Sequence, residues 1–411
     1  MRRPIVFLAD DFTGASDSLA SYARRGCKTR LLVDTDMDSV PHGLDAVGIA
    51  TDLRSLKPER AITQIERIWP MIARLSPERL HYKVCSTFDS SPTIGSIGAI
   101  ASELRARFRP DVMAVIGGQP SLGRYLCFGN LFARDGDGRV HRIDRHPVMS
   151  RHPVTPMTEI DLARHLAAQG LDDLDRVTFR ELAHTVQMAE RLRNGSVIFD
   201  VTSEQDQQLI GEALTLAGGR QLLIGASSVA EIIAGNIHPK ECEGDATPPG
   251  SKRFLAFAGS RSPITAQQVR ACAALDVVVV SPDRLADVGL VAECKDKLIS
   301  GHPVLIALDP ETDYTLSPDE LADCSVKLIA AILDGTSVGY VCVAGGDTSS
   351  RICAGLGFHA LEFEKVMERG VSMCVGRHRD AARDRMRLIL KGGQMGGTKF
   401  FDNALDQVRR S

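Results

Sequence analysis

Two adjacent carboxylates stand at the end of the first apolar segment of the chain. Asp10 and Asp11 follow Ile5–Ala9, and a helix is expected to begin near Thr13 or Gly14. In this position one carboxylate can cap the helix, while the other faces a ligand and orients a substrate hydroxyl or accepts its proton. The pattern leaves a second interpretation open, in which both acids serve only as caps or solvated surface groups.

Two cations and a run of hydroxyls follow later apolar segments. Arg54, shortly after Ala46–Ala50, can hold a carboxylate through paired hydrogen bonds. Lys83 precedes Ser86 and Thr87, so a positive charge and hydroxyl groups would meet in a pocket for a small, anionic, polyhydroxylated molecule. A surface arginine, and a surface lysine beside a serine-rich turn, are the alternatives.

Three turns in the C-terminal part are rich in glycine and small residues. Glycine lets the backbone approach an anion closely, and the free amides at a helix start favour negative charge. The turns together predict a site for a phosphorylated ligand, although each alone is also explained as a simple strand–helix connection. The chain has neither a GxxxxGK[ST] phosphate loop nor a GxGxxG dinucleotide fingerprint with its acid. The turns are Gly259–Pro263, Ala344–Ser349 and Lys391–Gly397.

Two of these turns carry further helix signals. Ser262 and Pro263 have the residue types of an N-cap and a first helical position. Asp347 can cap the helix expected at Arg351–Leu356, or it can orient Mg²⁺ or water around a transferring phosphate.

Short β-branched runs alternate with helical stretches, which is the pattern of an α/β protein with a mostly parallel sheet flanked by helices. Several runs are apolar at every position, as in strands covered on both faces. Thr265–Leu275 and Leu321–Leu333 are among the predicted helices. Ligands of open α/β sheets bind at the carboxyl ends of strands, where the residues described above are found. The predicted strands are Ile5–Ala9, Arg30–Val33, Ala46–Ala50, Val112–Ile116, Val197–Phe199, Leu222–Ile224, Phe254–Ala258, Val277–Val280, Val304–Ala307, Tyr340–Val343 and Leu388–Leu390.

The segment Pro239–Lys252 is rich in Pro, Gly and charge, and it has the composition of an interdomain linker. The chain is therefore expected to form an N-terminal domain over residues 1–240, a linker over 241–252 and a C-terminal domain over 253–411. Two domains imply a cleft between them, where ligands often bind, so the active site is expected in that cleft.

The composition argues against several classes of protein. The chain has 49 basic and 52 acidic residues with five Tyr and one Trp, which disfavours nucleic-acid binding through basic patches and stacking aromatics. No apolar run approaches the roughly 18 residues of a membrane span, and the short run behind the basic N-terminus is cut by acids. We expect a cytoplasmic protein without a membrane partner; a homo-oligomer is compatible with the sequence. His141, His146 and His152 lack zinc-ligand spacing, so no metal site built from side chains is predicted.

Six motifs in order along nearly the whole chain resemble the four-carbon acid sugar kinase family. They are FLADDFTGASDSLA (Phe7–Ala20), YKVCST (Tyr82–Thr87), HPVTPM (His152–Met157), GSRSPITAQQ (Gly259–Gln268), GGDTS (Gly345–Ser349) and KGGQMGG (Lys391–Gly397). The resemblance implies two α/β domains, the N-terminal one for a short sugar acid and the C-terminal one for ATP. It also implies an ATP- and Mg²⁺-dependent kinase that phosphorylates a terminal hydroxyl of an acid such as threonate or 3-oxo-tetronate.

The same resemblance implies roles for individual residues. Asp11 is expected to be the catalytic partner of the acceptor hydroxyl, with Asp347 as the alternative base or metal-organising acid. Departures from the family pattern at Cys85 and His152 lie on the substrate side and leave the particular sugar acid open. The expected substrate-binding residues are Asp10, Asp11, Arg54, Lys83, Cys85, Ser86 and Thr87. The expected ATP-binding residues are Ser260, Ser262, Gly345, Gly346, Asp347, Thr348, Gly392 and Gly393.

Two other functions stay open at this point. An NAD(P)-dependent hydroxy-acid oxidoreductase is disfavoured by the missing dinucleotide fingerprint, and a change in nicotinamide absorbance without ATP would reveal it. A non-catalytic regulator would bind nucleotide or sugar acid without releasing ADP.

Overall fold

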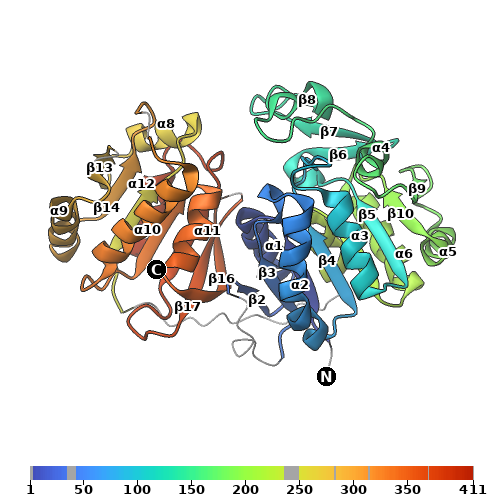
Figure 1. Ribbon diagram of the computed structural model, residues 1–411, viewed down its shortest axis with the longest axis horizontal. Coiled ribbons are helices and arrows are strands. Elements are labelled where there is room, and N and C mark those ends of the chain that lie inside the picture. Colours follow the sequence, from blue (N-terminus) through green and yellow to red (C-terminus); the bar gives the residue numbers. More distant parts are fainter. Residues whose placement is uncertain are drawn as a thin grey trace. The chain divides into compact units, whose positions relative to one another are not determined.

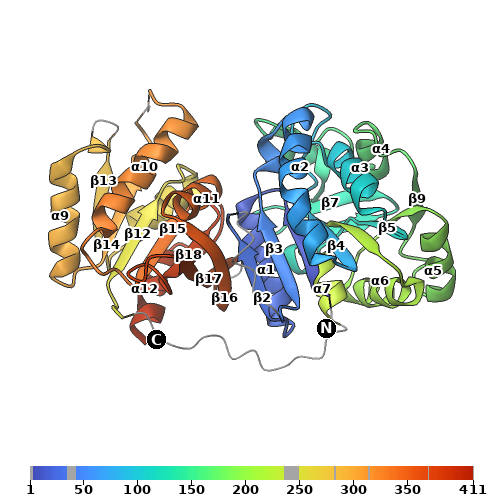
Figure 2. The ribbon, with the colours of Figure 1, turned by 60° about the horizontal axis from the view of Figure 1, so that its bottom comes forward.

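The computed structural model describes residues 3–34, 43–235, 250–281, 284–312, 315–368 and 370–410 (Figures 1 and 2). The chain divides into two compact units, Met1–Thr29 with Val40–Cys242, and Arg30–Ser39 with Glu243–Ser411. Most of the predicted linker, 241–252, lies outside the described residues, which resume at Gly250. Each unit is an α/β layer structure with helices packed on a sheet, as expected from the alternating sequence pattern.

A parallel sheet organises the N-terminal unit, with the strand order β3-β1-β4-β11-β5-β10-β9. β1 lies between β3 and β4, so Ala9 is paired with both Ala50 and Lys83. The carboxyl ends of these three strands therefore meet at one edge of the sheet. Its strands are β1 (Ile5–Ala9), β3 (Ala46–Ala50), β4 (Arg79–Lys83), β5 (Val112–Ile116), β9 (Leu174–Val177), β10 (Ser196–Phe199) and β11 (Gln221–Gly225).

The first helix shows why these segments pack as they do. Ala15, Leu19 and Tyr22 recur at helical spacing and are fully buried, so one face of the helix lies against the core. The α-helices of this unit are α1 (Phe12–Arg24), α2 (Pro58–Leu75), α3 (Ile97–Phe108), α4 (Leu162–Ala167), α5 (Thr185–Asn194), α6 (Glu204–Ala217) and α7 (Ser228–Ala234). Its 3-10 helices are η2 (Leu53–Ser55), η3 (Pro120–Leu122), η4 (Ile143–Arg145) and η5 (Met149–Arg151).

A small antiparallel sheet accompanies the main sheet of the N-terminal unit. It consists of β6 (Arg124–Cys127), β7 (Asn130–Arg134) and β8 (Val140–Arg142). These short strands carry several charged residues, and the sequence pattern did not predict them.

The C-terminal unit combines a parallel and an antiparallel part in the order β13-β14-β12-β15-β18-β17-β16-β2. The first five strands are parallel, and β17, β16 and β2 continue the sheet antiparallel. Its strands are β2 (Thr29–Leu32), β12 (Phe254–Ala258), β13 (Asp276–Val280), β14 (Val304–Leu308), β15 (Tyr340–Ala344), β16 (Phe358–Glu368), β17 (Val371–His378) and β18 (Arg387–Lys391). Its helices are α8 (Pro263–Ala271), α9 (Val288–Ile299), α10 (Pro318–Leu333), α11 (Gly346–Gly355) and α12 (Phe400–Arg410).

Helix starts in this unit confirm the predicted capping. The hydroxyl of Ser262 accepts the amide of Thr265 at 3.2 Å, and Pro263 occupies the first turn of α8. This helix ends at Ala271, earlier than predicted. α10 begins before Leu321, because Ser317 caps it and forms a capping box with Glu320.

One face of the central strands carries a core cluster of the C-terminal unit. Phe254 and Tyr340 from neighbouring parallel strands pack in one cluster with Phe400 and Phe401 from α12. Within the described part of the chain, every helix falls short of the length and apolarity that a bilayer crossing requires.

Candidate active site

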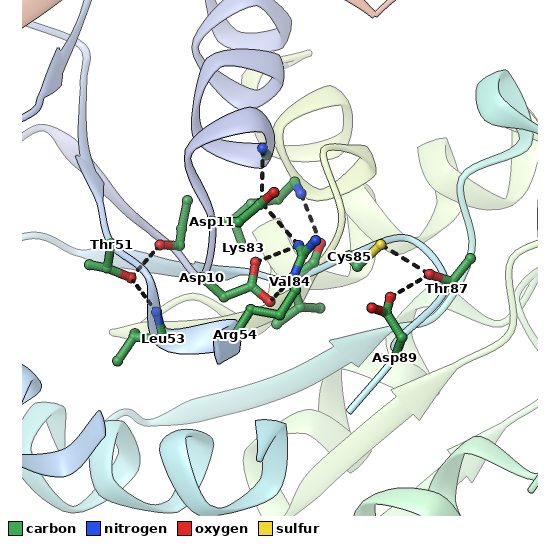
Figure 3. A network of polar contacts seen from close by, with 12 residues as sticks. Asp10, Asp11, Thr51, Leu53, Arg54, Lys83, Val84, Cys85, Thr87 and Asp89 are labelled. Carbon is green, nitrogen blue, oxygen red and sulfur yellow. Dashed lines mark hydrogen bonds and ion pairs between the residues drawn. The ribbon is translucent and has the colours of Figure 1, made fainter. Parts of the chain in front are cut away.

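Arg54 joins the two acids that follow β1 (Figure 3). Its guanidinium donates to both carboxylate oxygens of Asp10, from Nε at 3.2 Å and from Nη2 at 2.7 Å. The same Nη2 donates to Oδ1 of Asp11 at 2.9 Å. The Arg54 amide also donates to the Asp10 carbonyl at 3.0 Å, which ties η2 to the end of β1. Arg54, which the sequence predicts to hold a ligand carboxylate, therefore binds the carboxylates of Asp10 and Asp11.

Asp11 and Asp10 differ in exposure and in free hydrogen-bonding capacity. Oδ1 of Asp11 also accepts the amide of Gly14 at 2.9 Å, so Asp11 is the N-cap of α1. The Asp11 side chain is 24% exposed, whereas that of Asp10 is 4% exposed. Within the described residues, Oδ2 of Asp11 accepts no hydrogen bond, while both oxygens of Asp10 do. Asp11 is thus the acid that can meet a ligand, and Asp10 holds Arg54 in place.

Lys83, at the end of β4, is buried next to the acids. The residue is 4% exposed, and its Nζ donates to the Val84 carbonyl at 2.8 Å (Figure 3). No carboxylate of the described residues forms an ion pair with it. A Cβ atom on Gly14 would lie 2.7 Å from this Nζ and 2.4 Å from Oδ1 of Asp11. A side chain at position 14 would therefore require both charged groups to move.

Burial and charge act in opposite directions on the acid–arginine cluster. Burial, partly offset by the charge of Arg54, raises the pKa of Asp10. Burial disfavours the charged form of Arg54, but Asp10 and Asp11 outweigh it and raise the pKa of Arg54 well above its ordinary value. Arg54 is therefore charged at every pH at which the protein folds.

The turn after β4 contains a short chain of hydroxyl and thiol groups. Thr87 donates from Oγ1 to Oδ1 of Asp89 at 2.6 Å, and Sγ of Cys85 lies 3.0 Å from the same hydroxyl. Burial raises the pKa of Cys85 to about 11, so this side chain is a neutral thiol and not a nucleophile. Ser86 is half-buried in the same turn, whereas Thr87 is buried.

The three glycine-rich turns of the C-terminal unit come together at the ends of adjacent strands. β12, β15 and β18 are neighbours in the sheet. The amide of Ser260 donates to the Ala344 carbonyl at 2.9 Å, and the amide of Gly345 donates to the Lys391 carbonyl at 2.8 Å. Each turn is thus tied to the strand end of the next.

Ser262 and Gly393 link the first turn to the third. The Ser262 hydroxyl donates to the Gly393 carbonyl at 2.5 Å, and the Thr265 hydroxyl donates to the same oxygen at 2.9 Å. A Cβ atom on Gly393 would lie 2.3 Å from Oγ of Ser260. The two turns therefore touch at a point where a side chain on Gly393 would displace the Ser260 side chain.

The second turn leads directly into the N-terminus of α11. Gly345 is its N-cap, has a φ of 134° and provides no side-chain cap. The amides of Gly346, Asp347 and Thr348 in the first turn have no intrahelical acceptor, so they are open to an anion. The interpretation of Asp347 as the cap is therefore wrong; it lies inside the first turn, and its side chain is not among those that the structure describes.

Lys391, at the end of β18, also contacts these turns, although the sequence pattern did not single it out. It is 1% exposed, and its Nζ donates to Oγ1 of Thr265 at 3.3 Å and to the carbonyls of Gly392 and Met395 at 3.1 and 3.0 Å. Burial lowers the pKa of Lys391 to about 8. In the sequence, its position directly before Gly392 and Gly393 could have identified it. Lys391 holds the Gly392–Gly397 turn against α8.

The described side chains contain no cluster of three His, Cys, Asp or Glu residues that could hold a metal ion. His141, His146 and His152 instead make local hydrogen bonds. His141 contacts Asp135 at 2.7 Å, His146 accepts the amide of Val148 at 3.2 Å, and His152 accepts that of Thr155 at 3.1 Å.

Family models match most of the chain. A sugar-binding N-terminal domain matches residues 5–233, and a nucleotide-binding C-terminal domain matches residues 255–401. These two matches correspond to the two groups of residues described above, one after β1, β3 and β4 and the other after β12, β15 and β18.

Curated relatives are similar over nearly their full length. A 3-oxo-tetronate kinase of Methylobacterium radiotolerans is 31% identical, with 98% of this chain and 98% of the relative covered. A 3-oxo-isoapionate kinase of Paraburkholderia graminis is 30% identical, with 97% of this chain and 93% of the relative covered. Both relatives are named kinases, so the similarity does not favour an oxidoreductase or a non-catalytic regulator.

Solved structures share the fold. A Salmonella typhimurium LT2 structure described as a putative tRNA synthase has a TM-score of 0.80 at 24% identity and covers 98% of both chains. A Haemophilus influenzae protein has a TM-score of 0.76 at 22% identity, with 98% of this chain and 100% of that chain covered. At these identities the similarity establishes the fold alone.

Proposed function

The chain belongs to the four-carbon acid sugar kinase family, and from this premise we propose that it transfers the γ-phosphoryl group of ATP to a terminal hydroxyl of a four-carbon sugar acid. Family membership makes the protein a sugar-acid kinase, a phosphotransferase with an alcohol group as acceptor. The substrate, the residues that bind it and the metal are the proposed part.

The buried ammonium of Lys83 carries the assignment of an acidic substrate. Its side chain is almost fully buried, and the ammonium donates to a single backbone carbonyl. The remaining protons of the ammonium have no hydrogen-bond acceptor among the described residues, so they can bind a negatively charged ligand. The carboxylate of a sugar acid has that charge, and the hydroxyls of Ser86 and Thr87 line the following turn.

Asp11 is the proposed partner of the acceptor hydroxyl. One of its oxygens is held by Gly14 and Arg54, and the other is left for a ligand. A carboxylate held in this way can orient a substrate hydroxyl and take its proton as the phosphoryl group arrives. Asp10 and Arg54 act by positioning Asp11, since their strongest contacts are with one another.

The triphosphate is assigned to the converging turns of the C-terminal unit. The open amides of α11 and the close approach of Gly393 to Ser260 form a cradle that a Cβ atom would fill. Mg²⁺ would be held mainly by the phosphates and water, as is usual for this ion in kinases, and would neutralise their charge. Asp347 remains the proposed acid that organises it.

Phosphoryl transfer requires the acceptor oxygen to lie beside the γ-phosphorus, in line with the bond from phosphorus to the leaving oxygen. We therefore place the reaction in a cleft between a sugar-acid domain of residues 1–240 and a nucleotide domain of residues 253–411, joined by the linker 241–252. Closure of such a cleft would exclude water, which competes with the sugar hydroxyl as acceptor.

The test is a coupled ADP-release assay with ATP, Mg²⁺ and a panel of four- and five-carbon sugar acids. The panel includes 3-oxo-tetronate, threonate and 3-oxo-isoapionate. We expect substrate-dependent ADP release with at least one four-carbon acid. ADP release only with neutral sugars, or only with longer acids, would contradict the proposed substrate.

A further inference from the structure

A cavity of about 300 Å³ lies in the N-terminal unit at the amino ends of three neighbouring parallel strands, β1, β4 and β11. Of the residues that line it, Arg3 precedes β1, Pro77 precedes β4 and Arg220 precedes β11. The last turns of α2 and α3, which pack side by side, form another wall (Figure 1). Asp11 and Lys83 lie at the carboxyl ends of the same strands, about 15 Å away along the sheet. The cavity is therefore separate from the candidate active site.

Arg220 is held in place by its backbone and by its side chain. Its amide donates to Oδ2 of Asp111 at 2.8 Å, and its carbonyl accepts the amides of Asp111 and Val112 at 2.9 and 3.1 Å. Its guanidinium carbon lies 4.4 Å from the centre of the Phe108 ring. A guanidinium stacked on an aromatic ring can still donate from the N–H groups at its edge, and here those groups have no acceptor in the described part of the chain. Arg220 is thus a positioned donor for an anion.

The cavity carries more positive charge than the chain neutralises. Arg107, in the last turn of α3, forms ion pairs with Glu103 and, at 2.9 Å, with Glu66 of α2, so its charge serves to link the two helices. Arg3 and Arg220 form no ion pair with any carboxylate that the structure describes. None of the described residues that line the cavity is acidic. Two positive charges are therefore available to a ligand.

The rest of the lining suits the apolar body of a ligand. Trp69 is half-buried, and its indole N–H donates to no acceptor among the described residues, so both the ring face and the N–H can contact a ligand. Ile72 and Phe108 are buried and add apolar surface. The remaining residues of the lining are Ala73, Ser76 and Pro77.

We propose that this cavity binds a small aromatic phosphate monoester, with its phosphate on Arg3 and Arg220 and its ring against Trp69. A phosphate monoester carries a charge of about −1.5 to −2 at pH 7, which matches the two available positive charges. The cavity volume lies at the lower limit of small-molecule sites, about 300–1,000 Å³, so it fits one ring and one phosphate. The inference is independent of the proposed function, because no residue of the lining belongs to the candidate active site.

The only tryptophan of the chain lines this cavity, so its fluorescence reports a bound ligand. The full-length chain is titrated with phenyl phosphate, which has both the ring and the charge, with inorganic phosphate, which has only the charge, and with benzyl alcohol, which has only the ring. We expect a saturable change with phenyl phosphate and at least about tenfold weaker binding of the other two compounds. Benzoate, a ring with a single negative charge, should also bind more weakly than phenyl phosphate.

A first pair of variants tests the charge. Arg220→Gln removes the stacked guanidinium, whereas Arg74→Gln removes an exposed charge from the last turn of α2 that does not line the cavity. We expect Arg220→Gln to weaken phenyl phosphate binding at least about tenfold and Arg74→Gln to keep it within about twofold.

A second pair of variants tests the space. Ala73→Leu fills the cavity from an exposed position of α2, and Thr63→Leu adds the same side chain at an exposed position of α2 outside it. Only Ala73→Leu should weaken phenyl phosphate binding. The proposal would be overturned by a wild-type chain whose Trp69 signal does not saturate with phenyl phosphate, or by equal affinity for wild type, Arg220→Gln and Ala73→Leu. Binding of benzoate or inorganic phosphate as tight as that of phenyl phosphate would overturn the assigned ligand class.

Discussion

Arg54 and Asp10 form a two-point ion pair across the ends of β3 and β1. Nε and Nη2 of the arginine reach the two carboxylate oxygens at 3.2 and 2.7 Å, and the Asp10 side chain is 4% exposed. Because Nη2 also binds Asp11, this pair fixes the acid that we assign to catalysis. The relationship supports several measurable consequences.

Removing Arg54 should destabilise the N-terminal unit. Arg54→Met leaves the Asp10 charge buried and unpaired, which typically costs about 3–5 kcal/mol of the free energy of unfolding. Trp69, the only tryptophan of the chain, lies in α2 of this unit, so its fluorescence during urea unfolding reports the change. The double variant Arg54→Met/Asp10→Asn should recover most of the stability but not the activity. A single variant as stable as wild type would contradict the role given to the pair.

Asp11→Asn separates capping from chemistry. Asparagine caps helices about as well as aspartate, so α1 should keep its start and the protein its fold. We expect kcat to fall by about 10²–10⁴, as for loss of a general base, with calorimetric ATP affinity unchanged. Asp52→Asn, an exposed acid that follows β3 and binds Gln64, is the control and should keep wild-type activity. Wild-type turnover in Asp11→Asn would remove Asp11 from the mechanism.

Lys83→Met should weaken the binding of the sugar acid and leave the binding of ATP unchanged. A hydrogen bond to a charged group contributes about 1.5–3 kcal/mol, so the KM for the sugar acid should rise roughly 10- to 100-fold. The KM for ATP should stay the same, because Lys83 lies in the sugar-binding unit. Lys57→Met, which removes an exposed charge before α2, serves as the comparison. A rise in the KM for ATP instead would place Lys83 at the nucleotide.

Gly393→Ala should weaken nucleotide binding through a steric clash. The added Cβ would lie 2.3 Å from Oγ of Ser260, so the Ser260 side chain or one of the two turns must move. We expect calorimetric ATP affinity to fall by about tenfold or more, with the KM for the sugar acid little changed. Adding Ser260→Ala removes the clashing oxygen and should restore part of the affinity. A single variant that binds ATP normally would show that the contact between these turns is not required.

His81 should make the N-terminal unit sensitive to acid. Its ring is fully buried, with Tyr22 and the Gly225 carbonyl as partners at 3.2 Å each, and burial lowers its pKa from 6.5 to about 3. Below pH 6.5 the unfolded chain binds a proton at His81 that the folded chain does not. Stability is thus complete above pH 6.5 and lost as the pH falls toward 3, by about 2 kcal/mol at pH 5.

Urea unfolding followed by Trp69 fluorescence between pH 7.5 and 5 measures this loss. His81→Gln should flatten the pH dependence by that amount, whereas the exposed His184→Gln should not change it. An unchanged slope in His81→Gln would exclude His81 as its source.

Local sequence was sufficient for much of the fold and for the location of the site. Fully apolar runs such as Phe254–Ala258 indicate strands buried on both faces, because such a strand needs an apolar side chain at every position. Ser262 and Pro263 identified the start of α8 for a similarly local reason. By contrast, β16 alternates apolar and charged residues, and its pairing with β17 and β2 depends on distant segments. No local pattern specifies that Leu31 and Leu32 join the C-terminal unit.

The sequence by itself determined which side chains follow the strands and what chemistry they can do. The tertiary structure alone decided which of them meet. Strand order places β3, β1 and β4 side by side, and this makes Arg54 the partner of Asp10 and brings the ammonium of Lys83 next to both acids without an ion pair among the described residues. The physical reason is that hydrogen bonds and ion pairs depend on distances of a few ångströms between residues far apart in the chain, and only the folded sheet sets those distances.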